Sequence, residues 1–108
     1  MIALMEADPI VFSVQDVKST QLRPGVCRLK AEVHFNPWAL CDLYMDRDNN
    51  SDAILATCKQ TATDEEVRAM MRRYSRMYML TLAMEMDRLE TIVQKKYPEF
   101  RHIDLEIL

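Results

Sequence analysis

The end of the chain, Asp87–Leu108, constrains the fold most, because the period of its apolar residues changes within it. Leu89 and Val93 follow helical spacing, and Pro98 prevents a helix from continuing. From residue 101 onward, apolar and polar residues alternate. The apolar positions are Ile103, Leu105 and Ile107, and the polar positions are His102, Asp104 and Glu106. The chain therefore ends in a helix followed by a strand with one buried face. Such a strand needs partners, so we expect strands earlier in the chain with which it pairs.

Length and hydrophobic content favour one compact domain over residues 1–108. The chain has 108 residues, of which 49% are hydrophobic, enough for one core. Its net charge is −3 with acidic and basic residues mixed, so we expect no nucleic-acid partner. The longest apolar run, residues 77–84, is far shorter than the ~20 apolar residues of a membrane span. We therefore expect no segment of this chain to cross a membrane.

The remaining composition argues against several classes of site. The three cysteines are Cys27, Cys41 and Cys58, an odd number at wide spacing, which argues against a disulfide framework or a zinc ribbon and favours a reducing compartment. The chain has no nucleophile with a nearby base in sequence and no glycine-rich phosphate loop, since its one glycine, Gly25, lies in a predicted turn. We therefore expect that the chain is not an enzyme.

The first third of the chain predicts a helix end and two strands. Residues 2–8 are typical of the last turns of a helix that Pro9 ends. Residues 10–18 are rich in Val, Ile and Phe and predict a strand, and the polar residues 19–25 predict a hairpin loop with a turn at Pro24 and Gly25. Residues 26–35 alternate strictly and predict a second strand.

The middle of the chain predicts a helical insertion followed by a long helix. Residues 36–62 contain two short helical segments around a polar tract. Thr63 and Glu66 match a capping box, and no Gly or Pro follows before Pro98, so we predict a helix over residues 64–97. Such a helix would be ~50 Å long. We therefore expect either a break near Ser75 or a first half that projects from the domain body.

A strand, a helix and a strand in succession predict a right-handed crossover, which sets the last strand parallel to the second. The fold class is then α+β, a truncated ferredoxin-like αββαβ arrangement with a three-stranded mixed sheet and helices on one face. The polar residues of the last two strands lie together on the uncovered face. They are Lys30, Glu32, His34, His102, Asp104 and Glu106.

This open face allows two interpretations. His102 and Asp104 are two residues apart on one strand, so their side chains leave the same face ~6.6 Å apart and are candidates to bind one metal ion. Alternatively, Lys30 and Glu32, which lie beside Asp104 and Glu106, take part in cross-strand ion pairs, each worth ~0.2 to 1 kcal/mol.

Two further groups of side chains lie on the predicted long helix. Arg68, Arg72, Arg73 and Arg76 form a basic ridge that is either a solvated face or a surface for anionic lipids or an acidic partner. The methionines between Met70 and Met86 are expected to fill irregular gaps in a core or interface. A copper-binding methionine cluster would need accompanying His or Cys ligands.

Four stretches of the chain carry a resemblance to a known family. They are DPIVFSVQDVKST at the start, CRLKAEVHF at 27–35, TDEEV at 63–67 and MDRLETIVQKKYPEFRHIDLEIL at 86–108. With them the whole chain resembles the C-terminal domain of the cation diffusion facilitator family, in its zinc transporter nine branch. The last stretch is the most specific of the four.

The resemblance implies a metallochaperone-like domain attached to a six-helix transmembrane unit that exchanges zinc for protons. The expected function is that of a soluble dimerisation and regulatory domain, whose partners are a second copy and its own transmembrane unit. The expected location is the matrix side of a mitochondrial membrane, with the cytoplasm or nucleus as the alternative.

The resemblance also implies where zinc binds near the dimer contact. Members of the family use one His from each of the three strands, and the matching positions here hold Gln15, Glu32 and His102, with His34 two residues beyond Glu32. The candidate metal ligands are therefore His102, Asp104, Glu32 and His34.

A second hypothesis belongs to another class of protein. The Met-rich stretch Val67–Met86 has the spacing of a helix that binds in a partner's groove, which would make the chain a soluble interaction module. The resemblance to the zinc transporter nine branch implies that such a module would be coactivator-like. Burial of Met70, Tyr74 and Tyr78 would argue against this hypothesis.

Overall fold

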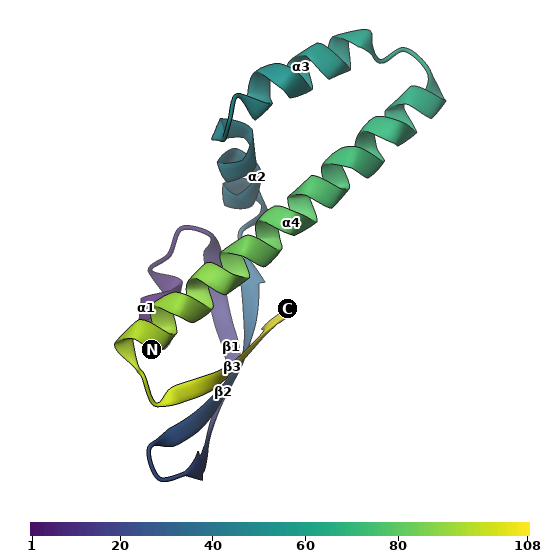
Figure 1. The fold of residues 1–108 in the computed structure, drawn as a ribbon. Helices are drawn as coiled ribbons and strands as arrows, with labels where there is room; N and C mark the ends of the chain where they lie inside the picture. The colour runs from purple at the N-terminus through teal and green to yellow at the C-terminus, as the bar shows by residue number, and fades with distance from the viewer. The chain divides into compact units, whose positions relative to one another are not determined.

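The computed structural model describes residues 1–108, and the chain forms two compact units (Figure 1). The first unit comprises residues 1–37 and 84–108, and the second comprises residues 38–83. The elements, in chain order, are α1 (Ile2–Glu6), β1 (Val11–Arg23), β2 (Val26–Phe35), α2 (Pro37–Asp46), α3 (Asn50–Gln60), α4 (Asp64–Lys96) and β3 (Phe100–Ile107). The predicted α+β class is confirmed, and the second unit contains the predicted insertion together with the first part of the long helix.

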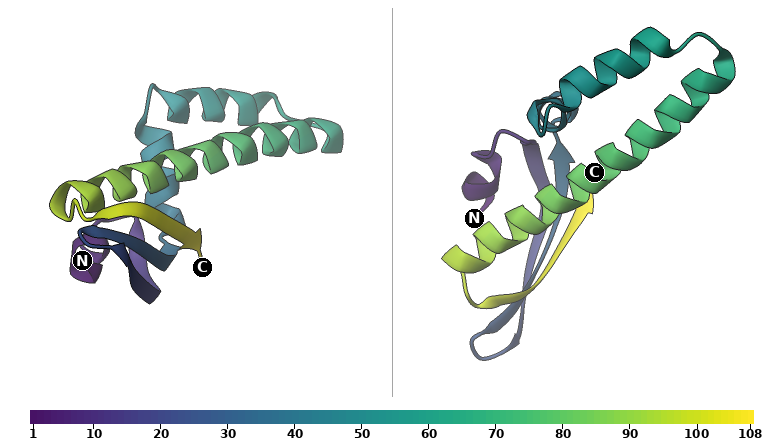
Figure 2. Two further views of the ribbon diagram at one scale, coloured as in Figure 1. Left: turned by 60° about the horizontal axis from the view of Figure 1, so that its bottom comes forward. Right: turned by 45° about the horizontal axis from the view of Figure 1, so that its top comes forward.

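The sheet of the first unit has the strand order β1-β2-β3, so β2 is central (Figure 2). β1 is antiparallel to β2, with Val14 opposite Val33, and β3 is parallel to β2, with Leu105 opposite Ala31. The parallel pairing confirms the predicted crossover through α4.

β1 is longer than the sequence predicted. The expected loop at residues 19–25 is wrong for Ser19–Arg23, which continue the ladder, with Ser19 opposite Leu29 and Arg23 opposite Val26. These side chains are exposed, so apolar content does not mark them as a strand, whereas pairing with β2 stabilises them. Only Pro24 and Gly25 form the turn, and the φ of 74° at Gly25 requires a residue that tolerates the left-handed region.

The core of this unit forms where α4 lies over the sheet (Figure 2). On β2, Leu29, Ala31 and Val33 are each 0% exposed, as the alternation predicted. On α4, Leu89 and Val93 are 1% and 0% exposed. Residues four apart share one face of a helix, so this pair presents a continuous apolar surface to the strands.

An arginine holds the start of the chain to α4. Arg88 donates two hydrogen bonds to the carboxylate of Asp8, at 2.7 and 2.9 Å, and a third to Glu85. Hydrogen bonding to Arg88 lowers the pKa of Asp8. Because Asp8 lies between α1 and β1, this bidentate pair fixes where the chain enters the sheet.

α4 is one continuous helix from Asp64 to Lys96, so the alternative of a break near Ser75 is wrong. A single serine does not interrupt the backbone hydrogen bonds, and the helix contains no Gly or Pro. The Thr63 half of the predicted capping box is present, because Thr63 Oγ1 accepts from the amide of Glu66 at 3.1 Å. The Glu66 carboxylate accepts from the Thr63 hydroxyl at 3.0 Å. The helix ends two residues before Pro98.

None of the helices is both long enough and apolar enough to cross a membrane.

The second unit has little core of its own. Leu40 and Thr81 are its buried residues, and α3 contributes none. α3 begins after Asn49, which adopts a left-handed conformation and makes no side-chain cap. α3 and α4 are connected by a hydrogen bond of 3.3 Å from the Tyr74 hydroxyl to Thr57 Oγ1.

The long-helix residues that distinguish the two functional hypotheses are half-buried. Met70, Tyr74 and Tyr78 are neither buried nor exposed, whereas Met71 and Met79 are 55% and 66% exposed. Full burial of Met70, Tyr74 and Tyr78 would argue against the interaction module. Their partial burial does not decide between the two hypotheses.

Leu89→Ala should lower the free energy of unfolding by ~2 to 5 kcal/mol, because it removes a fully buried side chain and leaves a cavity under the helix. Leu80→Ala is the matched control on the same helix. Leu80 is 49% exposed, so we expect a change of at most ~0.5 kcal/mol. Urea unfolding followed by circular dichroism measures both variants. Equal destabilisation by both would contradict the assigned core.

Candidate functional site: the open face of the sheet

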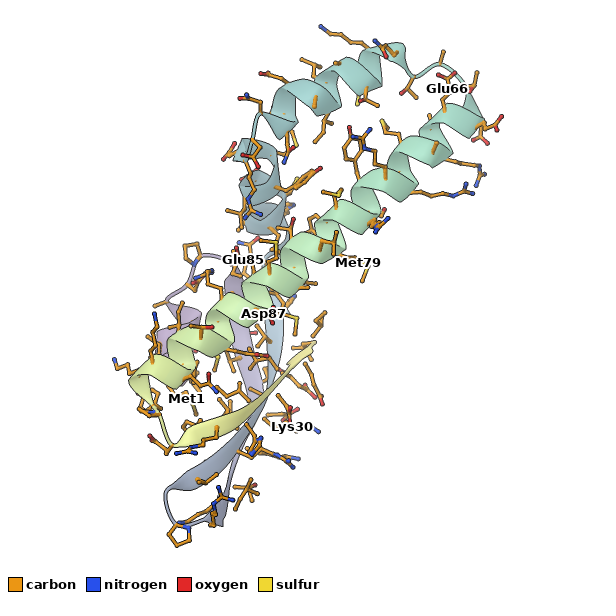
Figure 3. All side chains as sticks on the ribbon, viewed as in Figure 1. Met1, Lys30, Glu66, Met79, Glu85 and Asp87 are labelled. Carbon is orange, nitrogen blue, oxygen red and sulfur yellow. The ribbon has the colours of Figure 1, made fainter.

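The polar residues of β2 and β3 meet on the face of the sheet that α4 does not cover. Alternation along β2 directs Arg28, Lys30 and His34 away from the core, and all three are exposed. The parallel register then sets three residues of β3 beside this row (Figure 3, where Lys30 is labelled). The register pairs are Arg28 with His102, Lys30 with Asp104, and Glu32 with Glu106.

Two cross-strand ion pairs involve the two carboxylates of β3. Arg28 Nε lies 3.9 Å from Asp104 Oδ2, and Lys30 Nζ lies 3.2 Å from Glu106 Oε1. All four side chains are at least half exposed, so each pair stabilises the fold by only ~0.2 to 1 kcal/mol. The structure therefore confirms the predicted cross-strand ion pairs for Lys30, Asp104 and Glu106, although the partner of Asp104 is Arg28. Glu32 lies opposite Glu106, another carboxylate.

A shallow hollow of about 210 Å³ lies between the strands on this face. Its lining consists of Asp16, Lys18, Lys30, Glu32 and Glu106. Partial burial is the largest influence that raises the pKa of Glu32, and the neighbouring carboxylates of Asp16 and Glu106 raise it further, whereas Lys18 opposes them. The hollow is thus a place where carboxylates repel each other beside two lysines.

The sequence predictions missed Asp16 and Lys18. A register shift separates Gln15 from Lys18, and Asp16 has a φ of 49° within it. Such a bulge turns side chains out of strict alternation, and Asp is one of the few residues that tolerate this conformation. Alternation in the sequence does not reveal where a bulge falls, so no local signal marked these two residues.

The structure separates the two candidate histidines. His102 lies opposite Arg28, and His34 is six positions further along β2 (34 − 28), or about 20 Å. His34 instead contacts Phe12, with ring centroids 5.4 Å apart. Within residues 1–108, no three His, Cys, Asp or Glu side chains converge to hold a metal ion. His102, Asp104, Glu32 and His34 therefore do not form one tetrahedral zinc site within a single chain.

Glu32→Gln should stabilise the fold at pH 7. The folded state raises the pKa of Glu32, so ionising it above that pKa costs folding free energy, and this cost vanishes below the unfolded value of ~4.3. We expect the urea midpoint of the variant to exceed that of the wild type at pH 7 and to converge with it as the pH falls through 4. Glu99→Gln, outside the hollow, is the control. A lower midpoint for Glu32→Gln at pH 7 would disprove the assigned repulsion.

Comparisons of the sequence with known proteins find similarity to zinc antiporters. No family model matches the chain, and no solved structure matches it. The mouse proton-coupled zinc antiporter SLC30A9, mitochondrial, is 38% identical over 97% of the chain, and its human counterpart is 39% identical over the same share. The metal tolerance protein C4 of Arabidopsis thaliana is 28% identical over 98% of the chain.

The chain spans only a small part of these relatives: 18% of the mouse and human proteins and 24% of the plant protein. The resemblance inferred from the sequence is thereby confirmed, and the chain is similar along almost its entire length to one segment of the proton-coupled zinc antiporters SLC30A9.

Proposed function

We propose that this chain is the C-terminal, non-catalytic domain of a proton-coupled zinc antiporter and that it supports dimerisation and regulation of the transporter. The observation that carries the proposal is the similarity of 97% of the chain to a segment that makes up 18% of the antiporters. The transport pathway would then lie in the other four fifths of the protein. The α+β fold with a three-stranded mixed sheet agrees with the domain that the resemblance implies.

The open face of the sheet is the surface that we propose for contact with a second copy. It carries charges of both signs, from Arg28 and Lys30 on β2 and from Asp104 and Glu106 on β3. In a two-fold symmetric dimer the same surface meets itself, so a face with both signs can complement its own copy. The existing ion pairs are exposed and weak, and exchanging them for pairs across the interface would therefore cost little.

The same proposal assigns His102 as the anchor of a zinc site that a second copy completes. Asp104 is the neighbouring carboxylate on the same face, although it lies 3.9 Å from Arg28 in one chain. The missing donors would come from the partner subunit, because no third donor converges on His102 within the chain. Zinc affinity should then depend on dimer formation.

The relatives also supply a proposed location. The antiporters are described as mitochondrial, so we propose a mitochondrial membrane with this domain on the matrix side. The coactivator-like interaction module, in the cytoplasm or nucleus, stays a prediction. The exposed Met71 and Met79 are its support.

A chimera tests the transporter proposal directly. The 105 matched residues of the human antiporter are replaced by this chain, and zinc transport driven by a proton gradient is measured in vesicles. We expect the chimera to transport well above a variant that lacks the segment, because the domain supplies the same fold at the same place. A chimera that reaches the membrane but is as inactive as the deletion variant would contradict the proposal.

Zinc calorimetry and sedimentation test the metal and dimer proposals. We expect zinc binding by the wild type to be lost in His102→Ala and kept in His34→Ala, because the two imidazoles lie about 20 Å apart in one chain. Sedimentation at micromolar concentration should show a dimer that zinc stabilises. Equal binding by the wild type and His102→Ala would remove the His102 site, and a monomer with and without zinc would remove the dimer.

A further inference from the structure

A thiol and a thioether meet between α3 and α4 in the second unit. Cys58 Sγ, near the end of α3, lies 3.8 Å from Met70 Sδ on the second turn of α4. Cys58 is exposed and Met70 is half-buried, so solvent reaches the pair from one side. The two residues are twelve positions apart in the sequence, and the turn between the helices brings them together.

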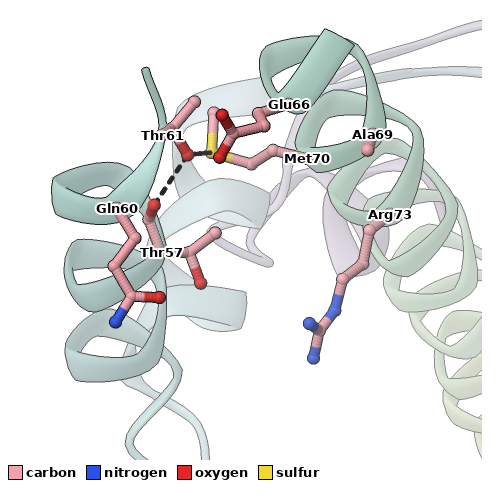
Figure 4. Close-up of a pocket in the computed structure, with 7 residues that line it drawn as sticks. All are labelled: Thr57, Gln60, Thr61, Glu66, Ala69, Met70 and Arg73. Carbon is pink, nitrogen blue, oxygen red and sulfur yellow. Dashed lines mark hydrogen bonds between the residues drawn. The ribbon is translucent and has the colours of Figure 1, made fainter. Parts of the chain in front are cut away.

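A threonine hydroxyl lies beside the Met70 sulfur. Thr61 Oγ1 lies 3.9 Å from Met70 Sδ, and its hydroxyl donates to the backbone carbonyl of Thr57 at 2.7 Å (Figure 4). The single hydroxyl hydrogen is therefore used, and the lone pairs of Thr61 Oγ1 stay available. Met70 and Thr61 line a cavity of about 290 Å³ between the helices. Its other lining residues are Thr57, Gln60, Glu66, Ala69 and Arg73.

Two sets of hydrogen bonds lie near the sulfurs, one at the start of α4 and one between the two helices. The capping box of Thr63 and Glu66 fixes the start of α4 just after the turn. The hydrogen bond from Tyr74 to Thr57 joins the helices one turn further along α4 from Met70. Both sulfurs therefore belong to helical residues, and helices position a site more precisely than loops do.

The separation of the sulfurs suits a shared metal ion. At a metal–sulfur bond of about 2.3 Å, two sulfurs 3.8 Å apart subtend an angle of about 110° at the metal. This angle leaves room for a third donor or a water molecule on the open side. A linear two-coordinate ion would need the sulfurs to move about 0.8 Å further apart, which a rotation of the flexible Met70 side chain can supply.

We propose that Cys58 and Met70 bind a soft monovalent cation of the copper(I) class, with Thr61 Oγ1 as a weaker third donor. Binding converts the Cys58 thiol to a thiolate and releases one proton to solvent, so the thiolate charge neutralises the cation. A thioether is a soft ligand that selects copper(I), whereas a structural zinc site needs four thiolate, imidazole or carboxylate donors. A copper-binding methionine cluster needs an accompanying His or Cys ligand, and the fold brings Cys58 to Met70. This proposal does not rest on the zinc transporter function and concerns other residues.

A competition titration tests the site. The full chain is titrated anaerobically with copper(I) against a coloured copper(I) chelator, and alkylation of each cysteine is followed in parallel by peptide mass spectrometry. Met70→Leu removes the thioether at nearly constant volume, and Met71→Leu is its control one residue away on the exposed side of α4. Cys58→Ser removes the thiolate, and Cys41→Ser is its control.

We expect one equivalent of copper(I) to bind the wild type and to protect Cys58 from alkylation, with zinc(II) giving no protection. Met70→Leu should weaken binding by about tenfold or more and Cys58→Ser should abolish it, while the two control variants should match the wild type. Binding by Met70→Leu as tight as that of the wild type would show capture by the cysteine alone and would overturn the proposal. Failure of the wild type to bind one equivalent, or loss of binding in Cys41→Ser, would overturn it as well.

Discussion

Burial of Leu89 and Val93 beneath the last turns of α4 is the interaction on which the sheet unit depends. These side chains are almost completely buried, as are Leu29, Ala31 and Val33 of the central strand, so the helix and β2 share the core of this unit. The last strand must return along the sheet after the helix has packed on it, and a right-handed crossover then makes β3 parallel to β2. The Arg88–Asp8 pair fixes the other end of the same arrangement, where the chain enters β1.

The same burial determines the chemistry of the open face. Because alternate residues of β2 face the core, the intervening ones are directed to the uncovered side and meet their neighbours from β3 there. The face that results has both signs of charge, ion pairs in solvent and one hollow in which carboxylates crowd around Glu32. Such a surface contributes little to stability. We therefore propose that its charges serve recognition of a second copy.

The second unit differs from the sheet unit in the type of ligand that it offers. The sheet face presents carboxylates and imidazoles, which suit hard or borderline cations such as zinc. The helices α3 and α4 present a thiol and a thioether 3.8 Å apart, which suit a soft cation. α3 contributes no buried residue, so the position of the two sulfurs depends on a few contacts between the helices rather than on a core.

The sequence alone determined the features whose cause lies within a few neighbouring residues. The alternation of β2 and β3, the capping box at Thr63, the turn at Gly25 and the end of α4 before Pro98 all follow from local spacing and backbone geometry. Tertiary structure decided which distant residues meet. Pairing with β2 made Ser19–Arg23 a strand, the parallel register separated His102 from His34, a bulge brought Asp16 to Glu32, and the turn between the helices brought Cys58 to Met70. The physical reason is that periodicity states which face of an element a residue occupies, whereas register and packing between elements depend on the core that they bury together.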